Sequence, residues 1–499
     1  MLKLLRWVIA CSLILGVLAT ACRSQTVPDT KRVIFNSDGY EIFKAGSDDI
    51  TDVSKYVFTG LEGSNVTTLF WCDGAGGNTA NYDSQVLELT GTRIGDVPPQ
   101  LLKWIDEGND PPAFVIKEAR KRDLEIFYSF RINDIHDHFK PELLATFKID
   151  HPDWLIDSTE YGYPTALNFA VPEVRELKLS VIREICSKYD FDGIEIDFMR
   201  GPPFFTPSEE QANKDILTDF LRTTREMLTQ LGEDRGREIE MAVRVGENLG
   251  ACTLDGFDIE TWVQKDLTDM IILGSGAIDI DITAFKKITG GTSIQVYPCL
   301  YGWPSGYMPI SEEMARGLAY NYWQQHADGI YLFNWFPHSS PYQIQLLKEI
   351  GSMESLVDKN KMFAADRSPN TPADEYPHNW LLAPLPRVFT GFFNGSSSWE
   401  SVPIQVFDDL ASRENQLKAI TLSVEISHSV EPGSIECRFN GHAVSLTPLP
   451  DATKATTNLL EADWFVVGEN TVELRLKNTD TENDTDITIR SVEIYVEYD

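Results

Sequence analysis

Two carboxylates set two residues apart mark one stretch of this chain as a place where chemistry could occur. Residues 189–200 read Tyr-Asp-Phe-Asp-Gly-Ile-Glu-Ile-Asp-Phe-Met-Arg. In this stretch Ile194 and Ile196 alternate with Glu195 and Asp197, which predicts a short buried strand with one apolar and one acidic face. A buried carboxylate without a partner is costly, so such a pair is kept either with partners or for chemistry.

Asp197 is the first candidate for a catalytic group. It lies near the carboxyl end of the predicted strand, and the chain-breaking sequence at 201–203 follows it. In a parallel α/β barrel, catalytic groups lie at that end of the strands. The alternative is a structural ion pair with Arg244 on the next strand. Glu195 lies one layer deeper, which favours an ion pair with Arg131 or Arg244 over direct chemistry.

Acid–base chemistry by carboxylates needs a second acidic group near Asp197. Glu247 follows the fifth predicted strand and could lean across the mouth of a barrel, or it could cap a loop. Asp73 at the end of the second strand and Asp38 at the end of the first compete with it. The sequence leaves the choice among the three open.

A polar cluster follows the third predicted strand. Arg131 and Asn133 share a strand face, which suits hydrogen bonding to a polar ligand and tuning of a nearby acid. His136 follows on the loop, where it either lines a site or is solvated. Asp134 and Asp137 flank this histidine, but the spacing matches no common metal motif, so we expect neither a metal nor another cofactor.

Aromatic and amide side chains fall at or beyond several strand ends. Aromatic faces and a few placed polar groups are typical of ligand clefts, although the same residues also pack barrel cores and lids. The candidates for ligand binding are Trp71, Tyr297, Trp303, Asn334 and Trp335.

The elements that would position these residues alternate between short apolar runs and helical segments. Eight such units over roughly 320 residues predict a (β/α)8 barrel at residues 32–363. An open doubly wound sheet competes, but no glycine-rich phosphate turn follows the first strand. The predicted strands are 33–38, 67–73, 125–133, 193–199, 240–246, 269–274, 293–300 and 329–335, and the predicted helices include 111–122, 171–189, 208–231, 259–265 and 311–326.

The character of the sequence changes after the barrel. Residues 364–386 are rich in Pro, Asp, Asn and Ser, which is typical of a linker. Residues 387–499 contain short alternating runs separated by turn residues such as Asn440-Gly441. These runs, at 419–426, 434–439, 464–466, 471–476 and 487–495, predict an antiparallel β-sandwich.

Composition and the amino-terminal residues limit the classes of partner and the cellular location that the protein can have. The 499 residues carry a formal net charge of −33, from 76 acidic and 43 basic residues, which argues against a nucleic acid partner. Residues 1–21 combine two basic residues with a short apolar run, which predicts a signal peptide rather than a membrane span. Cys22 follows a lipobox-like sequence and is the predicted lipidation site, and 22–31 form a tether. An exported protein held on a bacterial membrane is therefore expected, with ordinary secretion as the alternative.

Several motifs together resemble a known family. They are the Asp192-Gly193 run, the segment at 167–175, the Asp134-containing loop, Asp38, and residues 321–334. This set resembles the glycosyl-hydrolase-like family 10 of bacterial secreted proteins and lipoproteins. A chitinase mechanism is excluded, because the position of its acid is occupied here by Met199.

The resemblance implies hydrolysis of a glycosidic bond in a poly- or oligosaccharide by paired carboxylates in the barrel mouth. Asp197, Glu247 and Glu195 are then the catalytic candidates. The alternative is a carbohydrate-binding lipoprotein that keeps the barrel but has no competent acid pair. Sugar, linkage and oligomeric state stay open, as does whether the sandwich binds carbohydrate or supports the barrel.

Overall fold

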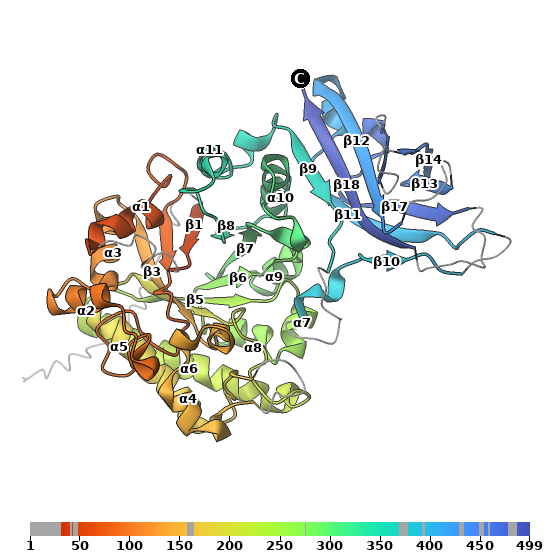
Figure 1. Cartoon of the computed structure of the whole chain (residues 1–499). Coiled ribbons are helices and arrows are strands. Elements are labelled where there is room, and N and C mark those ends of the chain that lie inside the picture. Colours follow the sequence, from red (N-terminus) through yellow and green to blue (C-terminus); the bar gives the residue numbers. More distant parts are fainter. Residues whose placement is uncertain are drawn as a thin grey trace, which may run out of the picture. The chain divides into compact units, whose positions relative to one another are not determined.

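Eight parallel strands close into a barrel, so the predicted fold class is confirmed. The structure is a computed structural model (Figure 1) that describes residues 31–39, 42, 48–156, 164–274, 276–368, 378–391, 395–428, 434–448, 454–457, 460–477 and 487–499. The barrel strands are β1 (Arg32–Ser37), β2 (Thr68–Trp71), β3 (Glu125–Arg131), β4 (Gly193–Asp197), β5 (Glu240–Val245), β6 (Met270–Leu273), β7 (Gln295–Tyr301) and β8 (Gly329–Phe333).

Helices follow the barrel strands in the order that a (β/α)8 fold requires. All five predicted helices are present, although their ends differ by a few residues. The helices are α1 (Val53–Val57), α2 (Pro99–Asp106), α3 (Pro111–Arg120), α4 (Thr146–Asp150), α5 (Pro172–Lys188), α6 (Glu210–Arg235), α7 (Leu249–Leu254), α8 (Ile259–Gln264), α9 (Ile282–Ile288), α10 (Glu312–Gln324) and α11 (Pro341–Glu349).

Successive side chains along a barrel strand point alternately toward the surrounding helices and into the barrel interior. On β4, Ile194 and Ile196 belong to the large apolar core that includes residues of the surrounding helices. Glu195 and Asp197 point the other way and share the barrel interior with a second apolar cluster that includes Phe127. The predicted apolar and acidic faces of this strand are therefore confirmed, because successive side chains of a strand point to opposite faces.

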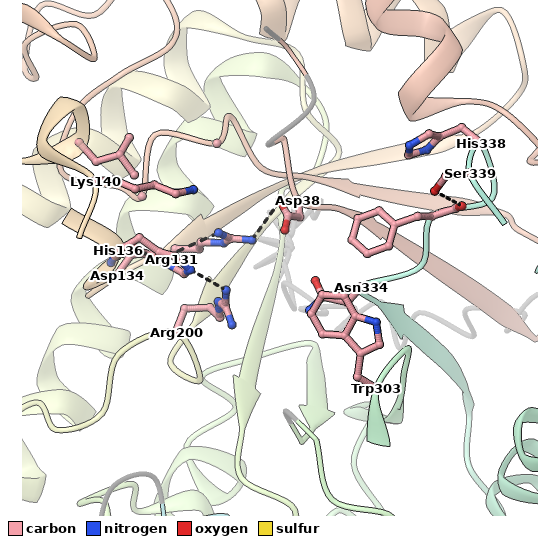
Figure 2. A pocket seen from close by; sticks show the side chains of 14 residues that line it. Asp38, Arg131, Asp134, His136, Lys140, Arg200, Trp303, Asn334, His338 and Ser339 are labelled. Carbon is pink, nitrogen blue, oxygen red and sulfur yellow. Dashed lines mark hydrogen bonds and ion pairs between the residues drawn. The ribbon is translucent and has the colours of Figure 1, made fainter. Parts of the chain in front are cut away.

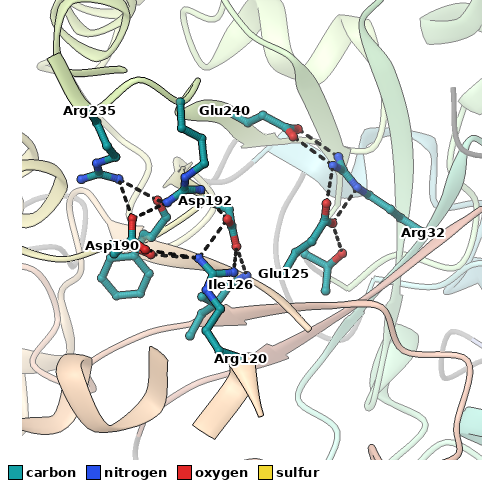
Figure 3. A network of polar contacts seen from close by, with 11 residues as sticks. Arg32, Arg120, Glu125, Ile126, Asp190, Asp192, Arg235 and Glu240 are labelled. Carbon is teal, nitrogen blue, oxygen red and sulfur yellow. Dashed lines mark hydrogen bonds and ion pairs between the residues drawn. The ribbon is translucent and has the colours of Figure 1, made fainter. Parts of the chain in front are cut away.

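Ion pairs hold the amino-terminal end of β4, opposite the barrel mouth (Figure 3). Asp192 accepts from Arg120 Nη1 at 2.6 Å, from Arg237 Nη1 at 2.5 Å and from the backbone N–H of Ile126 at 2.8 Å. The first acid of the Asp192-Gly193 motif is thus structural, and it joins β3, β4 and the helices around them.

Two antiparallel sheets follow the barrel and pack around a common apolar core. One sheet has the order β10 (Arg387–Val388), β18 (Thr488–Tyr498), β12 (Leu417–Ile426), β16 (Lys454–Thr457) and β15 (Thr447–Pro448). The other has the order β11 (Glu400–Val406), β17 (Gly468–Leu476), β13 (Ile435–Phe439) and β14 (His442–Val444). The predicted sandwich is confirmed.

Two details of the C-terminal sheets differ from the predicted strands. The run at 464–466 is not a strand, since a 3-10 helix occupies Ala462–Trp464. β9 (Lys361–Ala364), from the end of the range assigned to the barrel, pairs with β18. One strand just before the predicted linker thus belongs to the sandwich, because its backbone groups find partners on β18.

The predicted signal peptide, Cys22 and almost all of the tether lie outside the described residues. None of the described helices is both long and apolar enough to cross a membrane. Cys72, Cys186, Cys252, Cys299 and Cys437 are free and buried.

Candidate functional site

A cavity of about 440 Å³ opens at the carboxyl ends of the barrel strands. Its walls come from the loops after β1, β2, β3, β4, β7 and β8, the end of the barrel where binding groups are expected. Figure 2 shows a cationic side, an opposite side with aromatic residues, and Asp38 between them. The lining residues are Asp38, Gly74, Gly76, Arg131, Asp134, His136, Lys140, Leu143, Arg200, Trp303, Asn334, Phe336, His338 and Ser339.

Arg131 lies between the two carboxylates of the cavity. Its Nη2 is 3.5 Å from Asp38 Oδ1 and its Nη1 is 3.6 Å from Asp134 Oδ2. Burial works against ionisation of Asp134, but the hydrogen bond from His136 and the charge of Arg131 outweigh it and hold the pKa of this carboxyl below its usual range. Asp134 is therefore an anion at neutral pH.

His136 lies between Asp134 and Arg200 on the same side of the cavity. Its Nδ1 is 2.7 Å from Asp134 Oδ1, which also accepts the backbone N–H of His136 at 2.8 Å. Its Nε2 is 3.4 Å from Arg200 Nη2. A proton on Nδ1 satisfies both contacts, so Asp134 fixes the orientation of the ring.

Aromatic and amide groups form the other side. The ring centroids of Trp303 and Phe336 are 6.0 Å apart and tilted by 31°. Asn334 has a left-handed backbone with φ of 56° and donates from Nδ2 to the Tyr301 hydroxyl at 3.1 Å, while its Oδ1 is buried without a hydrogen bond. Such a wall suits the apolar face of a sugar ring with an amide beside it.

Five of the predicted site residues therefore line one cavity: Asp38, Arg131, His136, Trp303 and Asn334. The sequence did not predict as site residues six others that line the cavity: Asp134, Lys140, Arg200, Phe336, His338 and Ser339. Asp134 carried a usable signal, since it stands between two predicted site residues. Phe336 and His338 lie on a loop whose course no local pattern predicts.

The expectation that Asp197 opens into the barrel mouth is wrong. Its side chain is 0% exposed, and its Oδ2 accepts from Arg244 Nη1 at 3.1 Å while its Oδ1 accepts the backbone N–H of Met199 at 3.0 Å. The cause is the strand register, which places Arg131 and Arg244 level with Asp197 on the two neighbouring strands. Long side chains at that level cover the carboxylate.

Arg244 is a partner of this buried acid and not a cavity residue. Besides Asp197 it donates from Nε to the carbonyl of Gly274 at 2.9 Å, and its guanidinium carbon lies 3.9 Å from the ring centroid of Phe333. It is 0% exposed. The ion pair named from the sequence as the alternative for Asp197 is the arrangement that the structure contains.

Glu195 is buried one layer deeper, but the expected ion pair with an arginine is not its main contact. Its Oε2 accepts from Ser129 Oγ at 2.5 Å and from the Tyr331 hydroxyl at 3.1 Å. Burial and then repulsion from Asp197 raise the pKa of this carboxyl to about 8. Glu195 is therefore largely protonated at neutral pH, which is the less costly state for a buried acid with hydroxyl neighbours.

Glu247 does not reach across the mouth. It is 0% exposed, and its Oε1 accepts the backbone N–H groups of Gly276 and Ala277 at 3.0 and 3.1 Å. The loop-capping alternative describes its contacts, because the backbone after β6 turns back onto the end of β5 and brings two N–H groups to this carboxylate.

Asp73 and Asn133 also hold loops and do not line the cavity. Asp73 accepts the backbone N–H groups of Ala75 at 3.0 Å and Asn81 at 3.2 Å. Asn133 accepts from the N–H of Leu167 at 2.9 Å, and its Nδ2 donates to three backbone carbonyls. Both side chains bond to backbone groups of neighbouring loops, which are the groups that a buried loop must satisfy.

Three predicted aromatic ligand residues are packing residues. Trp71 is 0% exposed and belongs to the core that faces the helices. Tyr297 lies inside the barrel and donates to Gln295 at 2.7 Å, near the amino-terminal end of β7. Trp335 is 2% exposed and donates to the carbonyl of Leu300 at 2.9 Å. The sequence left core packing open as the alternative role of these residues, because it does not show which way each ring points.

The acidic loop after β3 does not gather into a metal site. Asp137 pairs with the buried Lys148 at 2.5 Å and with the Thr165 hydroxyl at 2.5 Å. Over the part of the chain that the structure describes, no group of three or more His, Cys, Asp or Glu side chains could hold a metal ion.

Comparison with known proteins finds a match to one family model over part of the barrel. Residues 59–216 match the family model described as Glycosyl hydrolase-like 10, so the predicted resemblance is confirmed over this part of the chain. The matched range contains Arg131, Asp134, His136 and Arg200, whereas Asp38 and the aromatic side of the cavity lie outside it.

Curated relatives and a solved structure share part of the chain. Glycosyl hydrolase YngK of Bacillus subtilis (strain 168) is 29% identical over 147 residues, which are 28% of this chain and 28% of that protein. Glycosyl hydrolase DigH of Escherichia coli (strain K12) is 28% identical over 120 residues, 20% of this chain and 27% of that protein. The glycoside hydrolase domain of PgaB (BpsB) from Bordetella bronchiseptica superposes with a TM-score of 0.45 at 11% identity, covering 65% of this chain and 99% of that domain.

Proposed function

We propose that this chain, which matches the glycosyl hydrolase-like family 10 over residues 59–216, hydrolyses the glycosidic bond of a saccharide held in the barrel-mouth cavity. One observation carries the proposal: Asp38 and Asp134 meet in the same cavity as the Trp303 and Phe336 rings. Glycoside hydrolysis needs two carboxyl groups beside the scissile bond, and aromatic faces hold the sugar ring.

The two carboxylates take different roles in this proposal. Asp134 is kept ionised by His136 and Arg131. It therefore serves as the carboxylate that either attacks the sugar carbon of the scissile bond or activates a water molecule for that attack. Asp38 has 20% of its side chain exposed at the cavity wall, so in this proposal it takes the other role, that of the proton donor to the leaving oxygen. Asp197 and Arg244, beneath them, support the floor and do not contact the saccharide.

A carbohydrate-binding protein without hydrolysis is the second candidate function. The observation that favours it is the burial of Asp197, since the strand-end acid that the sequence presents for catalysis is locked to Arg244. Binding would then use the same cavity and the same aromatic wall, and only the bond cleavage would be missing.

The test is a digestion of a polysaccharide and oligosaccharide panel with the purified protein, measuring released reducing ends. Replacing Asp38→Asn should lower release about 100-fold or more, because general acid catalysis contributes on the order of 10²–10⁴-fold. Binding of the same saccharide, measured by calorimetry, should persist because Asn keeps the size and most hydrogen bonds of Asp.

Asp358→Asn is the matched control, since this carboxylate is 72% exposed and lies outside the cavity. It should leave both release and binding unchanged. Binding without release across the panel would support the second candidate. Release that survives Asp38→Asn but is lost in Asp197→Asn, with the fold intact by circular dichroism, would return catalysis to the buried acid.

Export and lipid anchoring also belong to the proposed function. The basic and apolar residues of 1–21 and the small residues before Cys22 support cleavage at that cysteine and attachment of lipid to its thiol. The protein would then meet its saccharide outside the cytoplasm, on the surface of a membrane.

A further inference from the structure

The cavity is cationic in a strongly acidic chain. Among the described residues that line it, Arg131, Lys140 and Arg200 are basic, against the two acidic residues Asp38 and Asp134. The whole chain has a formal net charge of −33. A local excess of positive charge at the mouth of a barrel raises the local concentration of anions, because low-dielectric walls focus the field.

Arg200 has no carboxylate partner within the described part of the chain. Its Nη2 lies 3.4 Å from His136 Nε2, and its guanidinium carbon lies 5.4 Å from the ring centroid of Phe333. Its Nε is buried without a hydrogen bond. Burial lowers the pKa of Arg200, and the nearby charge of Arg131 lowers it further. A buried guanidinium nitrogen without an acceptor is costly unless a ligand supplies one.

Arg131 is loosely paired by the standard of this protein. Its contacts to Asp38 and Asp134 are 3.5 and 3.6 Å, and its Nη2 is buried without a hydrogen bond. Arg32, at the other end of the barrel, donates to Glu240 and Glu125 at 3.0 Å. The cavity arginines therefore retain donor capacity that the described residues do not use, although acidic side chains outnumber basic ones in the chain.

We infer that the saccharide bound in this cavity carries a carboxylate, which lies between Arg131 and Arg200. This inference rests on the proposed function, since it names the substrate class of the same cavity. A planar guanidinium matches a carboxylate through two parallel N–H···O bonds, which gives geometric selection as well as charge.

The arrangement of the cavity places the two parts of such a ligand. Arg131, Arg200, His136 and Lys140 lie on one side, and Trp303 lies across from them (Figure 2). The sugar ring would stack on the aromatic side while its carboxylate points to the arginines. Asp38 and Asp134 flank Arg131, so a carboxylate placed on their side of Arg131 would meet like charge and be repelled.

The experiment compares binding of matched saccharides to the purified full chain by calorimetry. Each pair consists of a uronate-containing oligosaccharide and the same oligosaccharide with its carboxylates reduced to alcohols, and a sulfated oligosaccharide forms a third arm. The acidic member should bind at least tenfold tighter than its reduced partner at low salt, and the difference should shrink as ionic strength rises. Arg200→Gln should remove the difference, and Arg200→Lys should restore part of it.

Arg222→Gln is the matched control, because this arginine lies on the outer surface of α6 and pairs with Glu226. It should keep the full preference. Equal binding of both members of a pair, or binding of neither across the panel, overturns the inference. A preference for the sulfated oligosaccharide over the carboxylated one also overturns it, because sulfate would then be the group that the arginines recognise. Acid-selective binding without reducing-end release would refute the proposed hydrolysis alone, whereas release from neutral saccharides with no acid preference would refute only the inference.

Discussion

At the scale of single residues, the barrel separates acids that hold the structure from acids that meet the cavity. Asp197 and Glu247 are fully buried, the first against Arg244 and the second against backbone N–H groups. Asp38 and Asp134 lie beside Arg131 at the cavity wall. The side chain type is the same in all four, so the difference in role comes from burial and from the partner that each carboxylate meets.

Glu195 gives a pH dependence of stability with a definite sign. Its pKa is about 8 in the folded protein, because burial and then the charge of Asp197 raise it from the usual value of 4.5 for a glutamate. The folded state therefore binds more protons than the unfolded state between these values, so its stabilising contribution is complete below about 4.5 and is lost as pH rises through 8. Glu195→Gln should flatten this fall.

The measurement is urea denaturation of the wild-type protein and of Glu195→Gln from pH 5 to 9. The free energy of unfolding of the variant should gain on that of the wild type as pH rises. Gln can still accept from Ser129 and Tyr331, so the hydrogen bonds to Oε2 are not the cause of a difference. Parallel pH curves for the two proteins would refute the raised pKa.

At the scale of elements, close contacts between neighbouring strands fix β4 in the barrel. Gly193 begins this strand, and a Cβ placed on it would lie 2.2 Å from Phe127 Cε1 and 2.5 Å from the carbonyl oxygen of Glu240. The strand can pair with β3 and β5 in its observed register only because this position has no side chain. That register in turn places Arg131 and Arg244 level with Asp197.

Gly193→Ala should therefore destabilise the protein by about 1–3 kcal/mol, the usual cost of overpacking a tight core. The reporter is the midpoint of urea denaturation at constant slope. Gly246→Ala is the control, because its Cβ would meet Cys252 Sγ at 3.5 Å, an ordinary van der Waals distance. Equal midpoints for the two variants would show that the contact at Gly193 relaxes freely.

At the scale of the whole molecule, the barrel and the sandwich are joined by side-chain contacts. Asn321 on α10 donates to the carbonyl of Gln405 at 2.9 Å and accepts from the N–H of Phe407 at 3.0 Å. A buried amide that satisfies two backbone groups links the two parts directionally. The sandwich is therefore attached to the barrel by more than the linker at 364–386.

The proposed anchor gives a prediction about where the whole protein resides. Cys22→Ser should release the protein from the membrane fraction of an expressing bacterium, because the thiol is the attachment point of the lipid. Cys11→Ser, inside the apolar run of the signal peptide, is the matched control and should leave the protein in that fraction. Labelling with a radioactive fatty acid should mark the control and not the variant. Membrane retention of Cys22→Ser would refute lipid anchoring.

The sequence by itself determined the barrel, the sandwich and the acidic face of β4. These follow from local information: alternation with a period of two, helical segments between the strands, and turn residues at their ends. It also placed Asp38, Arg131, His136, Trp303 and Asn334 at strand ends, where the cavity lies.

Only the tertiary structure decided which of the strand-end residues face the cavity. Strand register covered Asp197 with Arg131 and Arg244, and the loop after β6 turned back onto Glu247. Arg200 and Phe336 reach the cavity through loops that follow β4 and β8. Register and loop course depend on contacts between segments far apart in the chain, and a local pattern of residues carries no information about the partner that a side chain will meet.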